Sequence, residues 1–232
     1  MPAWSHVRSL IRRIATGYSA RQRERRRATF LARLQPTPSD RILDLGSEDG
    51  SHIAHVLGPG YDVSIADIDR DMLDRGRRRY GFTTVLIPED GVLPFPDESF
   101  DIVFCSSVLE HATVDKADLR RYRSTREFRQ AAWAHQQRLA AEIRRIGSRY
   151  YVQTPYRYFP VESHTWLPVI VVLLPRPLLI GLIERFNRFW PKKTVPDFNL
   201  LTRRQMRRLF PDAEIVCERS FGFVKSLTAV RT

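Results

Sequence analysis

The chain has 232 residues, of which 43% are hydrophobic, and a formal charge of +12 at pH 7. This length suits one α/β domain with some additions, and the hydrophobic content excludes a wholly disordered chain. The two cysteines, Cys105 and Cys217, indicate neither a disulfide framework nor a zinc site, so we expect no metal and a reducing, cytoplasmic environment. Arginines interrupt the apolar runs near the N-terminus, which argues against a secretory leader.

Residues 1–39 form a predicted basic, helical N-terminal extension. Residues 1–40 contain nine arginines but only two acids, Glu24 and Asp40. Apolar residues recur at helical spacing in the first part of this segment, at Trp4, Val7, Leu10, Ile11 and Ile14. A second helical segment is predicted for residues 21–34. Two interpretations stay open, because such a segment can contact an anionic membrane surface or can pack an apolar stripe on the domain.

A short apolar run, Ile42 to Leu45, leads into a turn that contains glycines. Gly46 and Gly50 allow the backbone to turn sharply and to approach a ligand closely. Ser51 to Leu57 is predicted to form the helix that follows. A strand, a glycine loop and a helix N-terminus in this order are typical of a nucleotide-binding site.

A carboxylate follows the second predicted strand. Asp67 comes directly after the run Tyr61 to Ala66 and lies 23 residues beyond Asp44. In nucleotide-binding folds, an acid roughly 20 residues beyond the glycine loop accepts hydrogen bonds from the ribose hydroxyls. The alternative is that Asp67 or Asp69 caps the helix predicted for residues 70–80. We predict that Asp67 is the acid that binds the ribose hydroxyls.

The next segment carries the most specific motif of the chain. A third strand, residues 83–87, precedes the acidic pair Glu89 and Asp90. The block Leu93-Pro94-Phe95-Pro96-Asp97-Glu98-Ser99-Phe100-Asp101 then leads into a strand over residues 102–105, and Leu109-Glu110-His111 begins the next predicted helix. We expect His111 to bond to backbone at that helix start.

Together these motifs resemble class I S-adenosylmethionine-dependent methyltransferases with a type 11-like domain, whose signature reads LPFPDxSFDxV…LEH. The resemblance covers roughly residues 40–155. It implies a Rossmann-like three-layer α/β/α sandwich with a seven-stranded, mostly parallel sheet and an antiparallel last strand. It also implies S-adenosyl-L-methionine as cofactor, bound by Asp44, Gly46, Glu48, Gly50, Asp67, Ile68, Glu89, Asp90, Cys105 and Ser106. The family usually has glycine at position 48, so two alternatives stay open: Glu48 clashes with the cofactor, or its carboxylate holds the cofactor's amino group.

A polar loop follows the fifth predicted strand, residues 150–154, which itself follows a helical segment over residues 115–146. Open α/β sheets bind ligands at the carboxyl ends of their strands. Glu162 and His164 lie in this loop and are our candidates for substrate contact or general base. The alternative is that both hold the loop together by hydrogen bonds.

The domain predicted for residues 40–232 contains a variable insertion at about residues 156–193. Its apolar part, residues 166–183, contains three prolines and an arginine, so it is a poor membrane span. It can form a lid over a lipid-like acceptor, a peripheral membrane contact, a dimer surface or a buried segment. A capped helix over residues 202–210 and strands over 213–218 and 223–230 complete the prediction.

The predicted function is methyl transfer from S-adenosylmethionine to a small-molecule, glycan or lipid-linked acceptor. Three rivals remain. A nucleic-acid methyltransferase would suit the arginines, but the motif typical of base-amine methylation is replaced by Cys105-Ser106-Ser107-Val108. A dinucleotide-dependent redox enzyme would leave the block from Leu93 to His111 unexplained. A non-catalytic, methyltransferase-like binding or membrane-associated module is the third. The acceptor and the oligomeric state are left open.

Overall fold

A computed structural model describes the backbone of residues 2–232 and the side chains of Arg13 and of residues 17–232. Seven strands form one sheet in the order β3-β2-β1-β4-β5-β7-β6. The strands are β1 (Arg41–Leu45), β2 (Asp62–Asp67), β3 (Thr83–Leu86), β4 (Phe100–Ser106), β5 (Gly147–Pro155), β6 (Glu214–Ser220) and β7 (Phe223–Arg231). The pairs from β3 to β5 are parallel, and β7 runs antiparallel to both β5 and β6. The predicted fold class is confirmed.

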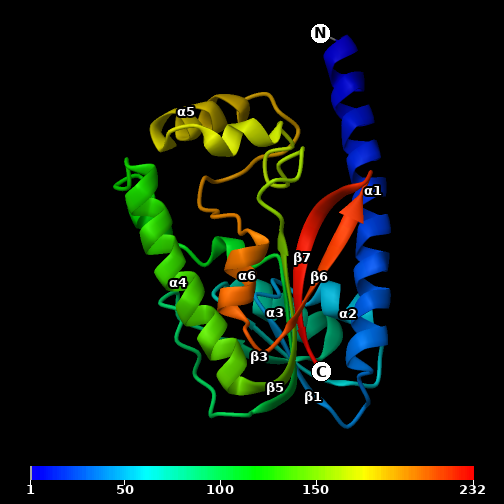
Figure 1. The fold of residues 1–232 in the computed structure, drawn as a ribbon. Coiled ribbons are helices and arrows are strands. Elements are labelled where there is room, and N and C mark those ends of the chain that lie inside the picture. Colours follow the sequence, from blue (N-terminus) through cyan, green and yellow to red (C-terminus); the bar gives the residue numbers. More distant parts are fainter. Residues whose placement is uncertain (1) are drawn as a thin grey trace.

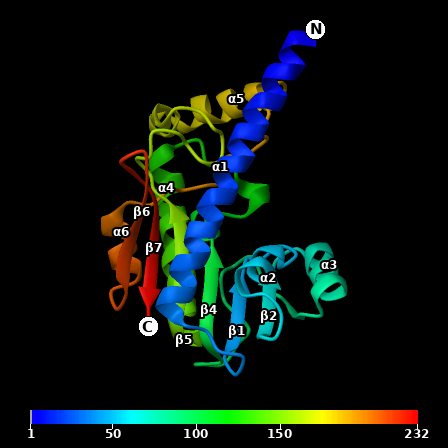
Figure 2. The same ribbon diagram turned by 90° about the vertical axis from the view of Figure 1, so that its right-hand side faces the viewer.

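Helices cover both faces of this sheet (Figures 1 and 2). The helices that cover the sheet are α1 (Pro2–Leu34), α2 (Ser51–Leu57), α3 (Arg70–Tyr80), α4 (Thr125–Ile146) and α6 (Arg203–Leu209), whereas α5 (Arg176–Phe186) lies beyond the ends of the strands. Buried residues of α4 and α6 pack on one face of the sheet. Buried residues of α1, α2 and α3 pack on the other face. The sandwich therefore has a separate apolar layer on each side of the sheet.

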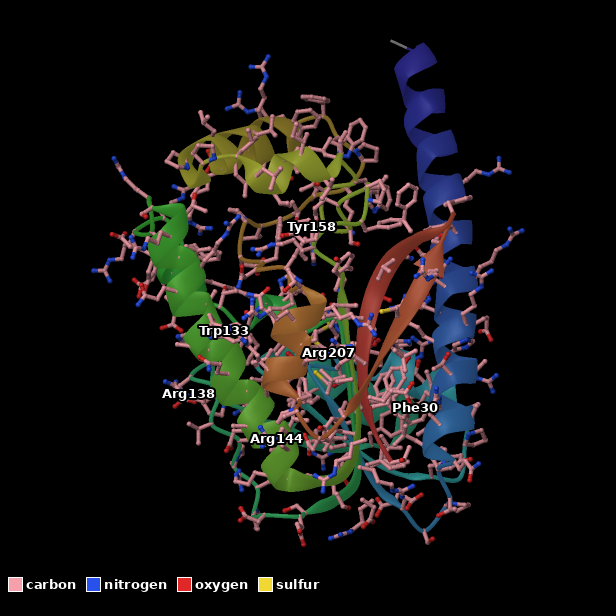
Figure 3. The ribbon with its side chains drawn as sticks, viewed as in Figure 1. Phe30, Trp133, Arg138, Arg144, Tyr158 and Arg207 are labelled. Atoms are coloured by element: carbon pink, nitrogen blue, oxygen red, sulfur yellow. The ribbon has the colours of Figure 1, made fainter. Side chains whose placement is uncertain are left out.

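The C-terminal part of α1 belongs to the core of the domain. Phe30 and Leu34 are fully or almost fully buried, and Phe30 packs edge-on against Phe104 and Tyr151 of the sheet (Figure 3). Burying an aromatic side chain of this kind contributes about 1.5–3 kcal/mol. The N-terminal part of the same helix extends beyond the rest of the molecule in both ribbon views. The apolar stripe predicted at Trp4, Val7, Leu10, Ile11 and Ile14 lies outside the described side chains.

Two local predictions were wrong. The segment Leu109–His111 forms a single 3₁₀ turn, η1, and does not begin a long helix. The helix predicted from residue 115 begins only at Thr125, where the Ser124 side chain accepts a hydrogen bond from the Glu127 amide. The residues before it include the short 3₁₀ turn η2 (Lys116–Asp118) and keep carbonyl groups free for Arg176, whose guanidinium donates to Leu119 and Tyr122. A regular helix would use those carbonyls itself.

Residues 156–199, here called the cap segment, lie beyond the carboxyl ends of the strands (Figure 1). They contain the 3₁₀ turn η3 (Val169–Leu173) and α5, and with Leu200 they form a small apolar cluster of their own. Part of the predicted apolar stretch is thus buried, but Ile170, Leu173 and Leu178 are each more than 60% exposed. Among residues 2–232, no helix has the length and apolar character needed to cross a bilayer.

Candidate functional site

A cavity of about 1100 Å³ opens at the carboxyl ends of β1, β4 and β5. The glycine loop after β1 and the first turn of α2 line part of it. Residues of α1, of the cap segment and of the hairpin β6–β7 complete the lining. The volume is slightly above the usual range of about 300–1000 Å³ for small-molecule sites, so it has room for two small molecules side by side.

The glycine loop is held in a shape that depends on its backbone. Gly46 has a φ of 71°, and its amide donates to the Ala66 carbonyl at 2.8 Å. A Cβ added there would meet a methyl group of Val108 at 2.4 Å, so only glycine fits. Glu48 also has a positive φ, 52°, and its amide donates to Asp67 Oδ2 at 2.8 Å. The positive φ explains why glycine is the usual residue at position 48.

Three buried polar atoms on this side of the cavity have no hydrogen-bond partner among the described residues. They are Asp44 Oδ2, Ser47 Oγ and His52 Nε2, and all three residues line the cavity. Burial, and then the neighbouring Asp67, raise the pKa of Asp44 well above its usual value. Burial, and then Arg26 and Arg23, lower the pKa of His52 to about 4, which leaves its ring neutral at pH 7. Because buried polar groups are normally hydrogen-bonded, this trio indicates the place of a polar ligand.

Comparison with known proteins supports the resemblance inferred from the motifs. Residues 43–146 match the family model described as a methyltransferase domain. Over these residues the chain is similar to class I methyltransferases. A ubiquinone/menaquinone biosynthesis C-methyltransferase from Xanthomonas campestris is 39% identical over 102 residues, which cover 39% of this chain and 40% of that protein. A demethylmenaquinone methyltransferase from Beutenbergia cavernae is 35% identical over 94 residues, with 40% and 39% covered. The matched segment thus spans about two fifths of these curated relatives.

Solved structures show the same fold. The PH0226 protein of Pyrococcus horikoshii superposes with a TM-score of 0.52 at 15% identity, covering 88% of this chain and 85% of that one. Magnesium protoporphyrin IX methyltransferase from Synechocystis, solved with bound SAH, gives 0.51 at 15% identity, covering 91% and 83%. The family resemblance inferred from the glycine loop, Asp67 and the block from Leu93 to His111 is confirmed.

The predicted cofactor residues of the methyltransferase domain fall into two groups. Asp44, Gly46, Glu48 and Ser106 line the cavity. The others are not among its lining residues: Gly50, Asp67, Ile68, Glu89, Asp90 and Cys105. For all ten residues, cofactor contact remains a prediction.

The second group has identifiable local roles. Gly50 has a φ of 70° where α2 begins, and Asp67 accepts the amides of Glu48 and Asp69 through its two oxygens. Asp67 therefore holds the glycine loop, and it is Asp69 that caps α3. Ile68 is 40% exposed, and Glu89 and Asp90 are exposed.

The side chains of Cys105 and Ser106 lie on opposite faces of the sheet, because successive residues of a strand point to opposite faces. Cys105 is fully buried in the apolar layer under α4 and α6, and burial raises the pKa of its thiol well above the usual value. Ser106 points to the cavity side, where its hydroxyl donates to Gln153 Oε1 at 3.0 Å. Ser107 and Arg26 donate to the same oxygen.

The predicted catalytic pair lies behind the cavity wall. Glu162 is 2% exposed, and its carboxylate accepts hydrogen bonds from the amides of His164 and Thr165, from the Thr165 hydroxyl and from the His164 ring. Although burial opposes it, contact with Glu110 and Glu162 raises the pKa of His164 to about 9. A protonated ring cannot accept a proton near neutral pH, so the geometry favours the structural alternative for both residues. Only Ser163, between them, lines the cavity.

Sequence reasoning missed the outer wall of the cavity. The Lys192 ammonium lies over the Trp166 ring at 5.3 Å, and that of Lys225 lies over Tyr18 at 4.3 Å. Burial lowers the pKa of Lys225 to about 8, with Glu218 opposing the shift. Tyr18 and Lys225 are more than 200 positions apart in the chain, so no local pattern could pair them. His52 could have been found, since a residue in the first turn of α2 faces the glycine loop.

Proposed function

We propose that this protein is an S-adenosylmethionine-dependent methyltransferase that acts on a small-molecule acceptor. The observation that carries the proposal is the trio of buried, unpartnered polar atoms on Asp44, Ser47 and His52 beside the glycine loop. A ligand with hydroxyl and amino groups would satisfy them, and S-adenosylmethionine carries both. When bound, the cofactor supplies a methyl group on a positively charged sulfur, which makes that methyl group electrophilic.

The residues of the inner half would hold the cofactor through charge and backbone shape. Asp44 is a buried carboxyl group, and burial followed by the neighbouring Asp67 raises its pKa. A positively charged ligand group beside Asp44 would favour its ionised form. Glu48 adds a second carboxylate to the same wall. Asp67 fixes the loop, and each of its oxygens keeps a second lone pair that can accept from a ribose hydroxyl.

The outer half would hold the acceptor. Its aromatic wall is made by Phe159, Trp166, Trp190 and Phe221, and two lysines lie over aromatic rings on the same side. A flat ring that carries hydroxyl or acidic groups matches such a surface, because aromatic faces stack and ammonium groups attract anions. The names of the relatives, which refer to quinone biosynthesis, support an acceptor of this kind. We therefore place hydroxylated ring compounds ahead of glycans and lipid-linked sugars.

Among the cavity-lining side chains, that of His52 is best suited to accept a hydrogen bond from the methyl acceptor. Its unpartnered Nε2 belongs to a neutral ring at pH 7. It can accept a hydrogen bond from an acceptor hydroxyl, whereas protonated His164 cannot. The rest of catalysis would come from aligning the two reactants in one cavity.

The test is transfer of a labelled methyl group from S-adenosylmethionine to a panel of acceptors. The panel contains benzoquinols, naphthoquinols, a glycan, a lipid-linked sugar and an oligonucleotide. The proposal expects label in a ring compound, and loss of that label in His52→Ala with cofactor affinity kept. Cofactor binding without transfer to any acceptor would favour the non-catalytic module. Transfer confined to the oligonucleotide would favour the nucleic-acid enzyme.

A further inference from the structure

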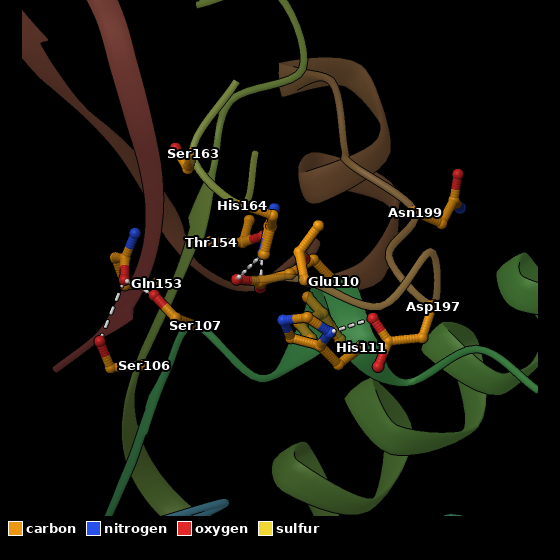
Figure 4. A network of polar contacts seen from close by, with 12 residues as sticks. Ser106, Ser107, Glu110, His111, Gln153, Thr154, Ser163, His164, Asp197 and Asn199 are labelled. Carbon is orange, nitrogen blue, oxygen red and sulfur yellow. Dashed lines mark hydrogen bonds and ion pairs between the residues drawn. The ribbon is translucent and has the colours of Figure 1, made fainter. Parts of the chain in front are cut away.

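Three potential metal ligands meet behind the cavity wall. Glu110 and His111 lie in η1, just after β4, and His164 lies in the cap segment. One ligand atom from each lies within 4.8 Å of the other two. Figure 4 shows these side chains gathered between the end of the strands and the cap segment. None of the three lines the methyltransferase cavity.

Both imidazole rings are already oriented by carboxylates. The Nδ1 atom of His164 lies 2.7 Å from Glu162, and the Nδ1 atom of His111 lies 3.0 Å from Asp197. A histidine that binds a metal through one nitrogen normally donates its other N–H to a carboxylate or carbonyl. Both rings therefore present the arrangement of metal-binding histidines, with Nε2 as the ligand atom; a metal that binds His164 displaces the proton from this nitrogen.

The third ligand has an unused oxygen. Glu110 is fully buried, and its Oε2 accepts from the Thr154 hydroxyl at 2.9 Å. Its Oε1 has no hydrogen-bond partner among the described residues, and the nearest cationic atom is His164 Nε2 at 3.8 Å. A buried carboxylate oxygen that lacks a hydrogen bond is costly, and a bound cation would satisfy it.

The local charges also favour a cation. Three carboxylates, those of Glu110, Glu162 and Asp197, surround the two histidines. The positively charged side chains that act on these carboxylates, Lys192 on Glu162 and Arg176 on Asp197, have other partners. Lys192 donates to the Ser163 carbonyl, and Arg176 donates to carbonyls before α4. Among the described side chains, none other than a protonated histidine thus places a cation at the centre of the cluster.

We propose that Glu110, His111 and His164 form a site for a divalent transition-metal ion of the Zn²⁺ class, which fastens the cap segment to the methyltransferase domain. Two imidazoles and one carboxylate suit Zn²⁺ better than Mg²⁺, which prefers oxygen ligands. Ligand atoms around tetrahedral zinc stand roughly 3.4 Å apart, so side chains whose ligand atoms lie up to 4.8 Å apart must close by up to about 1.4 Å. His111 can make that movement, since its side chain is 36% exposed. The same exposure gives the ion a route from solvent.

The experiment is a zinc titration of the full chain after treatment with a chelator. The proposal expects one Zn²⁺ per chain and a midpoint of thermal unfolding that rises by roughly 5 °C at a hundredfold excess over the dissociation constant. Mg²⁺ at the same concentration should leave the midpoint unchanged. Limited proteolysis should show the cap segment cut more slowly when zinc is present.

Variants assign the ion to this cluster. His111→Ala should lower zinc affinity at least tenfold, as should Asp197→Asn, which removes only the carboxylate that orients His111. His135→Ala, on α4, should bind zinc like the wild type. Loss of binding in His55→Ala would place the ion elsewhere and overturn the proposal. So would a wild-type chain that binds no zinc, or His111→Ala and Asp197→Asn chains that bind it unchanged. Cofactor binding is not read in this test, so its outcome is independent of the proposed enzyme activity.

Discussion

Two buried polar clusters lie near the cavity, one around the glycine loop and one in the cap segment after β5. They differ in how many of their polar atoms are hydrogen-bonded. Around the glycine loop, Asp44, Ser47 and His52 each leave a buried polar atom without a partner, and these residues face the cavity. After β5, Glu162 accepts four hydrogen bonds and none of its oxygens faces the cavity. The first cluster is arranged for a ligand, while the second holds the cap segment in place.

This contrast teaches that unused hydrogen-bonding capacity identifies a site better than residue type does. Histidine and glutamate are common catalytic residues, yet in the second cluster their protons and lone pairs are nearly all committed. Glu110 Oε1 is the exception there, and it is the atom on which the metal proposal rests. The following variants test the contrast, from the largest expected effect to the smallest.

Gly46→Ala should have the largest effect. The added Cβ would lie 2.4 Å from a Val108 methyl group at a φ of 71°, so the loop must shift away from the cavity. We expect at least a hundredfold loss of S-adenosylhomocysteine affinity in calorimetry. The matched control is Gly58→Ala, which also has a positive φ, 76°, but no atom within 4 Å of the new Cβ. Equal losses in both variants would contradict the account.

Glu162→Gln should destabilise the cap segment but leave cofactor affinity nearly unchanged. The amide replaces an oxygen that accepts from N–H and O–H donors, which leaves buried donors unpaired at a cost of about 1–3 kcal/mol. Measured on metal-free protein, limited proteolysis within residues 156–199 should be roughly tenfold faster or more. Cofactor affinity should stay within about threefold of the wild type. A large loss of cofactor affinity, with the cap segment cut no faster than in the wild type, would contradict this account. It would mean that the Glu162 cluster serves cofactor binding and does not hold the cap segment.

Asp44→Asn should separate binding from stability. Burial raises the pKa of Asp44 in the folded state, so the free energy of unfolding falls as pH rises from the usual aspartate value of about 3.9 to that raised value. The neutral isostere should therefore raise the free energy of unfolding at neutral pH by about 1 kcal/mol. It should also weaken S-adenosylmethionine binding roughly tenfold, because a carboxylate next to a positive ligand group is lost.

The pH dependence of binding provides a second readout for Asp44. In the wild type, affinity for S-adenosylmethionine should increase with pH as Asp44 ionises, and in Asp44→Asn this increase should disappear. Calorimetry at several pH values measures both. The same slope in the two proteins would assign the dependence to another group.

The smallest expected effect is the contribution of Lys225 to the pH dependence of stability. It reports on the surroundings of one side chain. Its folded pKa of about 8 lies below the usual lysine value of about 10.4, because burial against Tyr18 disfavours the ammonium form. The folded state is therefore favoured as pH rises through that range. Nuclear magnetic resonance of isotopically methylated lysines should show Lys225 titrating about two units below the usual lysine value. Titration of Lys225 at the usual lysine value would mean that this part of the cavity is open to water.

The fold was predictable because its signals are local. Apolar runs and the positions of glycines predicted β1, α2, β2 and α3. The spacing of Thr202 and Gln205 predicted the capping box of α6. The cofactor half was partly predictable, since Asp44, Gly46 and Glu48 belong to one loop. The catalytic assignment of Glu162 and His164 stays a prediction, and part of the surroundings of His164 is non-local. His164 contacts Glu110, which lies 54 positions earlier, and this contact together with Glu162 raises the pKa of the ring. The pairing of Tyr18 with Lys225 is equally invisible to local patterns.

The most direct test of the account is calorimetric titration of S-adenosylhomocysteine into the wild type, Asp44→Asn and Glu162→Gln. We predict one site per chain with micromolar affinity in the wild type. Asp44→Asn should weaken that site about tenfold, and Glu162→Gln should leave it nearly unchanged. A folded wild-type protein that binds no S-adenosylhomocysteine would contradict the central claim that the polar atoms beside the glycine loop await this ligand.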